Sequence, residues 1–149
     1  MLDALPSLGL MATTAFVAAT VFPAQSEAVF LGLLAAKSAP PLALFLVASA
    51  ANTAGAAANW LLGKIIADGG LSRLPARLQP SPKQLLKGEA QFARYGWLLL
   101  LFSWLPVIGD MATVVAGTLR YPLWRFLLIV GLGKAARYAV LWAGFAALW

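Results

Sequence analysis

The run Ser103-Trp-Leu-Pro-Val-Ile-Gly-Asp110 interrupts the apolar residues 96–119 with Pro106 and, four residues later, an acid. The run Pro23-Ala-Gln-Ser-Glu27 interrupts the apolar residues 8–36 in the same way. A proline in a helix interior costs about 3 kcal/mol, and an ionised acid at mid-membrane costs roughly 2.5–3.5 kcal/mol. Irregular backbone is tolerated at that depth where it lines a cavity. The two runs therefore predict two broken helices around a polar cavity.

The composition indicates a membrane protein. Of the 149 residues, 62% are hydrophobic and 11% are charged, and the mean hydropathy is +0.83. Soluble domains contain about 25% charged residues. A globule with this composition could not cover itself with polar side chains, so lipid is the expected solvent.

Charge and residue types exclude several function classes. The net charge of +6 comes from basic residues at the edges of apolar stretches or between them, which is typical of contact with anionic headgroups and not of nucleic-acid binding. The sequence has no cysteine and no histidine, so thiol nucleophiles, disulfides and His–Cys metal sites are excluded. We predict no cofactor, no metal site and no enzyme activity. Because Asp3, and no base, precedes the apolar residues 8–22, we expect no cleaved signal peptide.

Two further apolar stretches, residues 42–62 and 126–149, are predicted to span the membrane, since a crossing helix needs about 20 residues. The first has a small residue at every fourth position: Ala51, Gly55, Asn59 and Gly63. Such a face lets another helix approach closely. The partner helix could belong to the same chain or to a second copy, so a homo-oligomer stays open.

Residues 64–94 form the polar connection between the halves. Glycines and prolines predict a loop in its first part. From Lys83, the segment KQLLKGEAQFARYG has the pattern of an amphipathic helix, which we expect to lie on the membrane surface. An ordinary solvated linker helix is the alternative.

The two halves have the same order of residues. Each contains a proline, an acid, a base and a second proline: Pro23, Glu27, Lys37 and Pro40 in one, and Pro106, Asp110, Arg120 and Pro122 in the other. The spacings from proline to acid and from acid to base are four and ten in both. We therefore predict a single all-α membrane domain with repeat one at residues 8–63, a linker and surface helix at 64–94, and repeat two at 95–149. The alternative is the loose self-similarity of any small helical membrane protein.

This repeat predicts the topology. If the broken helices are re-entrant hairpins, one crossing separates them and they enter from opposite faces, as in inverted-repeat transporters. Glu27 and Asp110 would then meet near the midplane. Ser26 and Gly109, which complete the helix breaks at Pro23 and Pro106, would leave backbone N–H groups free for an anion or water.

Two bases lie well inside the last apolar stretch. Lys134 and Arg137 are three residues apart and so share one helix face. We expect them to pair with Glu27 and Asp110. In the functional interpretation a carboxylate takes up a proton and releases its base, which then binds an anionic substrate. In the structural interpretation the pairs only lock the bundle.

Motifs along nearly the whole chain match one family. They are Phe22-Pro-Ala-Gln-Ser-Glu27, Asn52-Thr-Ala-Gly55, Arg94-Tyr-Gly96, Ser103-Trp-Leu-Pro-Val-Ile-Gly-Asp110, Ala116-Gly117, Arg120-Tyr-Pro122, Arg125-Phe126 and Gly133-Lys-Ala-Ala-Arg-Tyr138. In these residues the chain resembles the DedA family of bacterial membrane proteins, which have the VTT domain, and in particular its short YqaA-type branch.

The resemblance implies two re-entrant hairpins in an inverted repeat, a multi-pass location in the bacterial inner membrane, and movement of lipids or lipid-linked phosphates. It also implies that Glu27 and Asp110 are proton-linked acids and that Arg137 is a basic partner or phosphate ligand. The chain departs from the family at Ser103 and Gly109, where the broader family has arginines. Lys134 together with Arg137 would replace them, or the substrate differs.

The leading hypothesis is a proton-coupled transporter or flippase for a lipid or lipid-linked phosphate. Glu27 and Asp110 would be its proton-linked acids. The residues predicted to bind substrate or to form ion pairs are Lys134, Arg137, Asn52, Arg120 and Lys37. The alternatives are a non-transporting scaffold that supports envelope integrity and, third, an intramembrane enzyme that uses both acids.

Orientation follows from the topology. With two hairpins, eight bases share one side, against Lys37 on the other: Lys64, Arg73, Arg77, Lys83, Lys87, Arg94, Arg120 and Arg125. That side would be cytoplasmic, with both termini outside. If all four apolar stretches cross, both termini are cytoplasmic instead.

Overall fold

The computed structural model describes residues 4–20, 26–70, 82–104 and 108–148, and within these ranges the chain is all-α, as predicted. The helices are α1 (Leu5–Ala18), α2 (Ser26–Ala35), α3 (Pro41–Ile65), α4 (Pro82–Leu101), α5 (Ile108–Thr118) and α6 (Leu123–Leu148). A π-helical turn, η2 (Ile66–Gly70), continues α3, and a 3₁₀ turn, η5 (Phe102–Trp104), follows α4.

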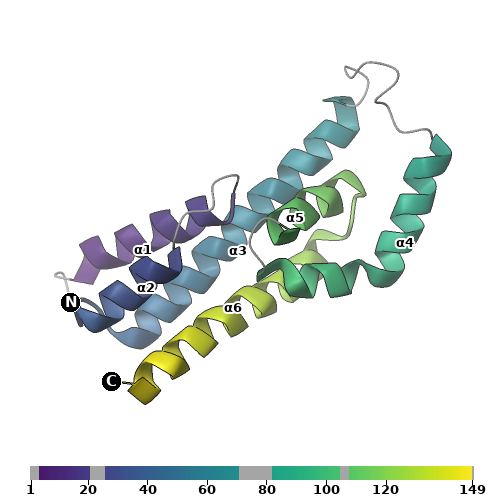
Figure 1. Ribbon diagram of the computed structural model, residues 1–149. Helices are drawn as coiled ribbons and strands as arrows, with labels where there is room; N and C mark the ends of the chain where they lie inside the picture. The colour runs from purple at the N-terminus through teal and green to yellow at the C-terminus, as the bar shows by residue number, and fades with distance from the viewer. Residues whose placement is uncertain (1–3, 21–25, 71–81, 105–107, 149) are drawn as a thin grey trace.

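The long helices α3 and α6 form the axis of the molecule (Figure 1). They pack against each other and run in opposite directions. Both are long and apolar enough to cross a membrane. In each, only 28% of the most apolar stretch of 18 residues is buried. Most of their apolar surface therefore faces outward, as expected for helices in lipid. The predicted spans 42–62 and 126–149 correspond to these two helices.

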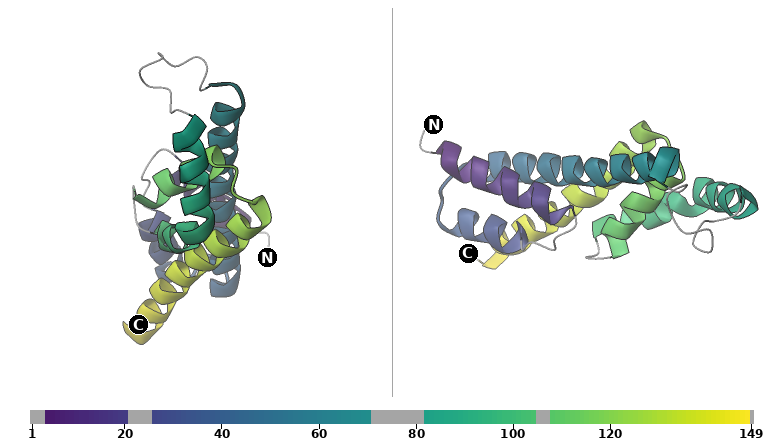
Figure 2. Two further views of the ribbon diagram at one scale, coloured as in Figure 1. Left: turned by 90° about the vertical axis from the view of Figure 1, so that its right-hand side faces the viewer. Right: turned by 90° about the horizontal axis from the view of Figure 1, so that it is seen from above.

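The short helices lie at opposite halves of this axis. Helices α1 and α2 lie along one half, and α4 and α5 along the other (Figure 2). Helices α1 and α5 both pack extensively on α3. Each predicted broken stretch is thus a pair of helices in the structure, and the predicted break residues Pro23 and Pro106 lie outside the described residues.

The small residues of α3 make close contacts within the chain. A Cβ atom on Gly55 would collide with the backbone oxygen of Phe16 in α1, and one on Gly63 with that of Val114 in α5. On α5, a Cβ atom on Gly117 would collide with the backbone oxygen of Trp60. The small-residue face predicted from the sequence therefore brings α1 and α5 onto α3.

The start of the polar connection is helical, where a loop was predicted. Helix α3 runs to Ile65 and η2 continues to Gly70, and residues 71–81 of the expected loop lie outside the described residues. Lys64 in the last turn of α3 favours the helix C-terminus electrostatically. The amphipathic segment expected from Lys83 forms the first part of α4, which bends sharply along its length (Figure 1). No proline interrupts residues 83–101, so the hydrogen-bonded ladder can continue through Gly96.

The turns after α2 and α5 have the same backbone geometry. Lys37 and Arg120 have positive φ values of 50° and 54°, the only such non-glycine residues described. In each turn this residue donates its N–H to the carbonyl three residues earlier, and the next residue donates to the carbonyl five residues before it. This double pattern is the Schellman motif. The matching turns are what an internal repeat predicts. The inverted repeat and its boundaries at residues 8–63 and 95–149 stay predictions.

Candidate functional site

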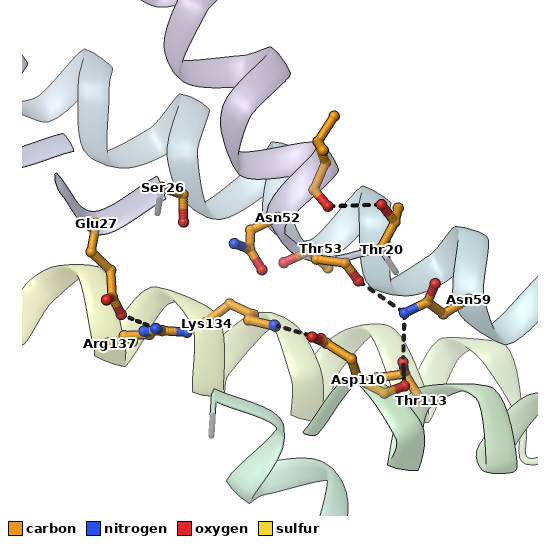
Figure 3. Close-up of polar contacts among 12 residues, drawn as sticks. Thr20, Ser26, Glu27, Asn52, Thr53, Asn59, Asp110, Thr113, Lys134 and Arg137 are labelled. Carbon is orange, nitrogen blue, oxygen red and sulfur yellow. Dashed lines mark hydrogen bonds and ion pairs between the residues drawn. The ribbon is translucent and has the colours of Figure 1, made fainter. Parts of the chain in front are cut away.

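The candidate site surrounds the middle of α6. Glu27 lies in the first turn of α2 and Asp110 in the first turn of α5, where a negative charge is favoured by the helix dipole. Lys134 and Arg137 reach out from one side of α6, with Asp110 toward one end of the pair and Glu27 toward the other (Figure 3). The structure thus brings all four predicted charged residues to one helix face.

The outer ion pair joins Arg137 to Glu27. The Arg137 guanidinium contacts the Glu27 carboxylate directly. Their side chains are 21% and 40% exposed, respectively. This pair is therefore accessible from outside the bundle.

The inner pair joins Lys134 to Asp110. The Lys134 Nζ atom lies 3.8 Å from Asp110 Oδ1, and the two side chains are 3% and 22% exposed. This distance is too long for a direct hydrogen bond. A buried ammonium held at this distance keeps hydrogen-bonding capacity that a water molecule or a substrate group could use.

Buried polar groups connect the two acid-bearing helices to the axis. The Tyr138 hydroxyl donates to Ser26 Oγ at 3.0 Å and accepts from Asn52 Nδ2 at 3.2 Å. On the other side, Asn59 Nδ2 donates to Thr113 Oγ1 at 3.1 Å and to the Ala19 carbonyl at 2.9 Å. Side chains from α2, α3, α5 and α6 therefore form one polar layer between the helices.

Two atoms in this layer have no hydrogen-bond partner among the described residues. They are Asn52 Oδ1 and Ser103 Oγ, on side chains that belong to residues 2% and 1% exposed. Unsatisfied buried polar atoms are costly in a folded protein. Together with the Lys134 ammonium they give the interior both acceptors and a donor that a bound polar group could satisfy.

A pocket of about 830 Å³ opens beside the outer pair. Apart from Glu27 and Arg137 its lining is apolar, with Leu101 and Phe102 on one side and residues of α6 on the other. Its volume falls in the range of small-molecule sites. Asp110 and Lys134 do not line it, so the single shared pocket expected for both acids resolves into one accessible pair and one buried pair.

Other predicted site residues lie elsewhere. Lys37 is exposed in the turn after α2. Arg120 pairs on the surface with Asp68 of η2 at 2.8 Å. Gly109 packs on the backbone of Ser103, where a Cβ atom would collide with the carbonyl oxygen. A side chain at residue 109 would therefore require the backbone at Ser103 to shift.

Sequence reasoning missed the roles of Tyr138, Asn59 and Thr113. Tyr138 lies four residues after Lys134, so the two share one helix face, and this spacing was a usable signal. Nothing local in the sequence pairs Asn59 with Thr113, which are 54 residues apart. The described residues contain no group of three or more acids that could hold a metal ion.

Comparison with known proteins identifies the family. The model of the VTT domain matches residues 5–146, almost the whole chain. The chain belongs to the VTT-domain (DedA) family. It is 34% identical to the inner membrane protein YqaA of Escherichia coli over 93% of this chain and 89% of that protein. It is 35% identical to an uncharacterized protein of Haemophilus influenzae over 91% and 85%. No solved structure matches the chain.

The YqaA-type resemblance read from the motifs is therefore confirmed. The family and the outward-facing apolar helices together establish a membrane protein. Within this VTT-domain chain, the matched motifs include all four charged residues of the site.

Proposed function

We propose that this VTT-domain protein is a proton-coupled transporter or flippase for a lipid or lipid-linked phosphate in the bacterial inner membrane. The observation that carries the proposal is the Glu27–Arg137 pair in the wall of an otherwise apolar pocket. An amphiphile needs both features, because its chains require apolar surface and its anionic headgroup requires a base. Protonation of Glu27 would release Arg137 for the headgroup.

The inner pair provides a second proton-linked group in this proposal. Lys134 lies about one helical turn before Arg137 on α6, so the Asp110–Lys134 pair is next to the outer pair. The unpaired Asn52 carbonyl and Ser103 hydroxyl supply polar contacts near the same level of the axis. A headgroup that moves along this face of α6 would pass from an accessible site to a buried one.

The lengths of the short helices support re-entrant hairpins. With a rise of 1.5 Å per residue, α1, α2 and α5 span only about 21, 15 and 16 Å, whereas the hydrocarbon core is about 30 Å thick. The matching turns at Lys37 and Arg120 support the repeat. In this topology α3 and α6 are the only full crossings and the hairpins enter from opposite faces.

A transport assay in proteoliposomes tests the function. Glu27→Gln should abolish movement of a fluorescent anionic lipid between leaflets while the protein still folds. Asp68→Asn is the matched control, because it removes the carboxylate of an ion pair on the surface, away from the pocket. Normal transport by Glu27→Gln would contradict the proposal. Loss of folding in place of loss of transport would favour the scaffold, and a chemically altered lipid in the mass spectrum would favour an enzyme.

Single introduced cysteines test the topology, since the chain has none of its own. We propose Ser7, Ser38, Ser81 and Thr118 as positions. Labelling of residues 7 and 38 from the same face is the expected result for the first hairpin. Labelling from opposite faces would remove it.

A further inference from the structure

The two equivalent turns have different surroundings. After α5, Tyr121 follows the positive-φ residue and is 7% exposed. Its ring contacts Phe92 of α4 edge-on, with ring centroids 5.4 Å apart. Its carbonyl accepts a hydrogen bond of 3.0 Å from the indole of Trp60. Aromatic side chains therefore fill the space between this turn, α3 and α4.

The turn after α2 has the same backbone geometry, but it has no aromatic residue at the position of Tyr121. Ser38 follows the positive-φ residue of this turn, as Tyr121 does in the other, and the first turn has one further residue, Ala39, before its proline. Trp142 of α6 corresponds to Trp60 of α3, since each lies 20 positions after the proline of its repeat. Beside this turn there is a pocket of about 770 Å³. Its lining includes Lys37, Ala39, Pro40, Trp142 and Phe145.

The bases of the two turns also differ in their partners. Arg120 has the carboxylate of Asp68 at 2.8 Å. The ion pairs found among residues 4–20, 26–70, 82–104 and 108–148 include none for Lys37. In those ranges the Trp142 indole also lacks the acceptor that Trp60 has in Tyr121. The first turn thus offers a base and an N–H donor at the mouth of an apolar pocket.

We propose that this pocket binds a lipid of the surrounding membrane with an anionic headgroup. The headgroup would take the place that Asp68 has at the other turn and bind Lys37 and the Trp142 N–H. One acyl chain would fill the apolar part of this pocket, against Pro40 and Phe145. Tryptophan beside a base is typical of the membrane interface, and anionic lipids attract such bases. This pocket is separate from the pocket beside Glu27 and Arg137. The lipid-binding proposal rests on the comparison of the two turns and does not depend on the transport proposal.

Native mass spectrometry of the full chain tests this site. The probes are phosphatidylglycerol and phosphatidylcholine with identical acyl chains, offered separately to delipidated protein. We expect phosphatidylglycerol to bind with preference over phosphatidylcholine, and one such lipid should remain in the Arg137→Gln background, which removes the base of the pocket beside Glu27. Lys37→Gln should weaken it about fivefold, the effect of one base at a membrane surface. Arg120→Gln is the matched control at the other turn and should leave binding unchanged.

A second variant narrows the pocket. Ser38→Tyr introduces the side chain of the other turn into the lining and, in the same Arg137→Gln background, should weaken the remaining phosphatidylglycerol binding. If this variant does not fold, quenching of Trp142 fluorescence by phosphatidylglycerol with brominated chains gives an independent measurement, with Trp142→Phe to isolate the signal. Equal binding of both lipids, or equal effects of Lys37→Gln and Arg120→Gln, would overturn the proposal. Glu27→Gln should retain this binding even where it abolishes transport, so the two proposals fail separately.

Discussion

Helices α2 and α5 are similar in sequence position and differ in how they are held. Each has an acid in its first turn that pairs with a base of α6 (Figure 3). Helix α5 packs backbone to backbone on α3 through Gly63 and Gly117. Helix α2 is held to α6 by the Tyr138 side chain and by the exposed Glu27–Arg137 pair.

The difference suggests a division of roles. Close backbone contact and a buried ion pair make α5 part of the rigid axis, because both are disrupted by any separation. Helix α2 reaches α6 through the Tyr138 hydroxyl, a ring contact between Phe30 and Tyr138 and an accessible ion pair, and it buries Phe30 and Leu34 in the core. Segments with few buried contacts open at lower free energy than the core. We expect α2 to move first when the site opens.

The largest expected effect concerns the inner pair. Asp110→Asn leaves the Lys134 ammonium, 3% exposed, without its acid, and breaking a buried pair costs about 3–5 kcal/mol. The free energy of unfolding in detergent, followed by titration with a denaturing detergent, measures this loss. The double variant Asp110→Asn/Lys134→Met should recover most of it. If Asp110→Asn alone were as stable as the unchanged protein, the inner pair would contribute no more to the free energy of unfolding than the outer pair.

The next effect separates the packing of the two helices. Gly117→Ala should destabilise the protein by about 1–3 kcal/mol, because the new methyl group collides with the backbone oxygen of Trp60. Gly32→Ala in α2 is the matched control, since a Cβ atom there has nothing within 4 Å, and alanine favours a helix over glycine by about 1 kcal/mol. Thermal unfolding of both variants measures the contrast. Equal losses would remove the proposed difference between α5 and α2.

A smaller effect tests the connection of α2 to the axis. Tyr138→Phe removes the hydroxyl that bonds Ser26 and Asn52, at a cost of about 1–3 kcal/mol for the buried partners left unsatisfied. Hydrogen exchange should become faster in α2 while α5 stays protected. The comparison would fail if α5 responded as strongly as α2.

The smallest effect on stability is expected at the outer pair. Glu27→Gln should change the free energy of unfolding by about 1 kcal/mol or less, because in our proposal water enters the open pocket and screens this pair. The same denaturation assay applies. A loss as large as that of Asp110→Asn would mean that the pocket beside Glu27 is dry, and the accessible role given to this pair would be wrong.

Much of the fold could be predicted from the sequence, because the relevant signals are local. The spans of α3 and α6 follow from uninterrupted apolar residues, and the close contacts of α3 from its small residues. The helical structure of residues 66–70 was missed because the glycines there predict a loop. The Asp68–Arg120 pair was missed because its residues are 52 positions apart.

By itself, the sequence determined the solvent of this protein, its two spanning helices, its four central charges and its family. These depend on composition, on residue spacing and on motifs, all of which can be read directly from the linear sequence. Only the tertiary structure decided that one ion pair is accessible and the other buried, and that Tyr121 is buried in its turn whereas a pocket lies beside Ser38 in the other. Burial depends on which distant segments cover a side chain, and that information is distributed over the whole chain.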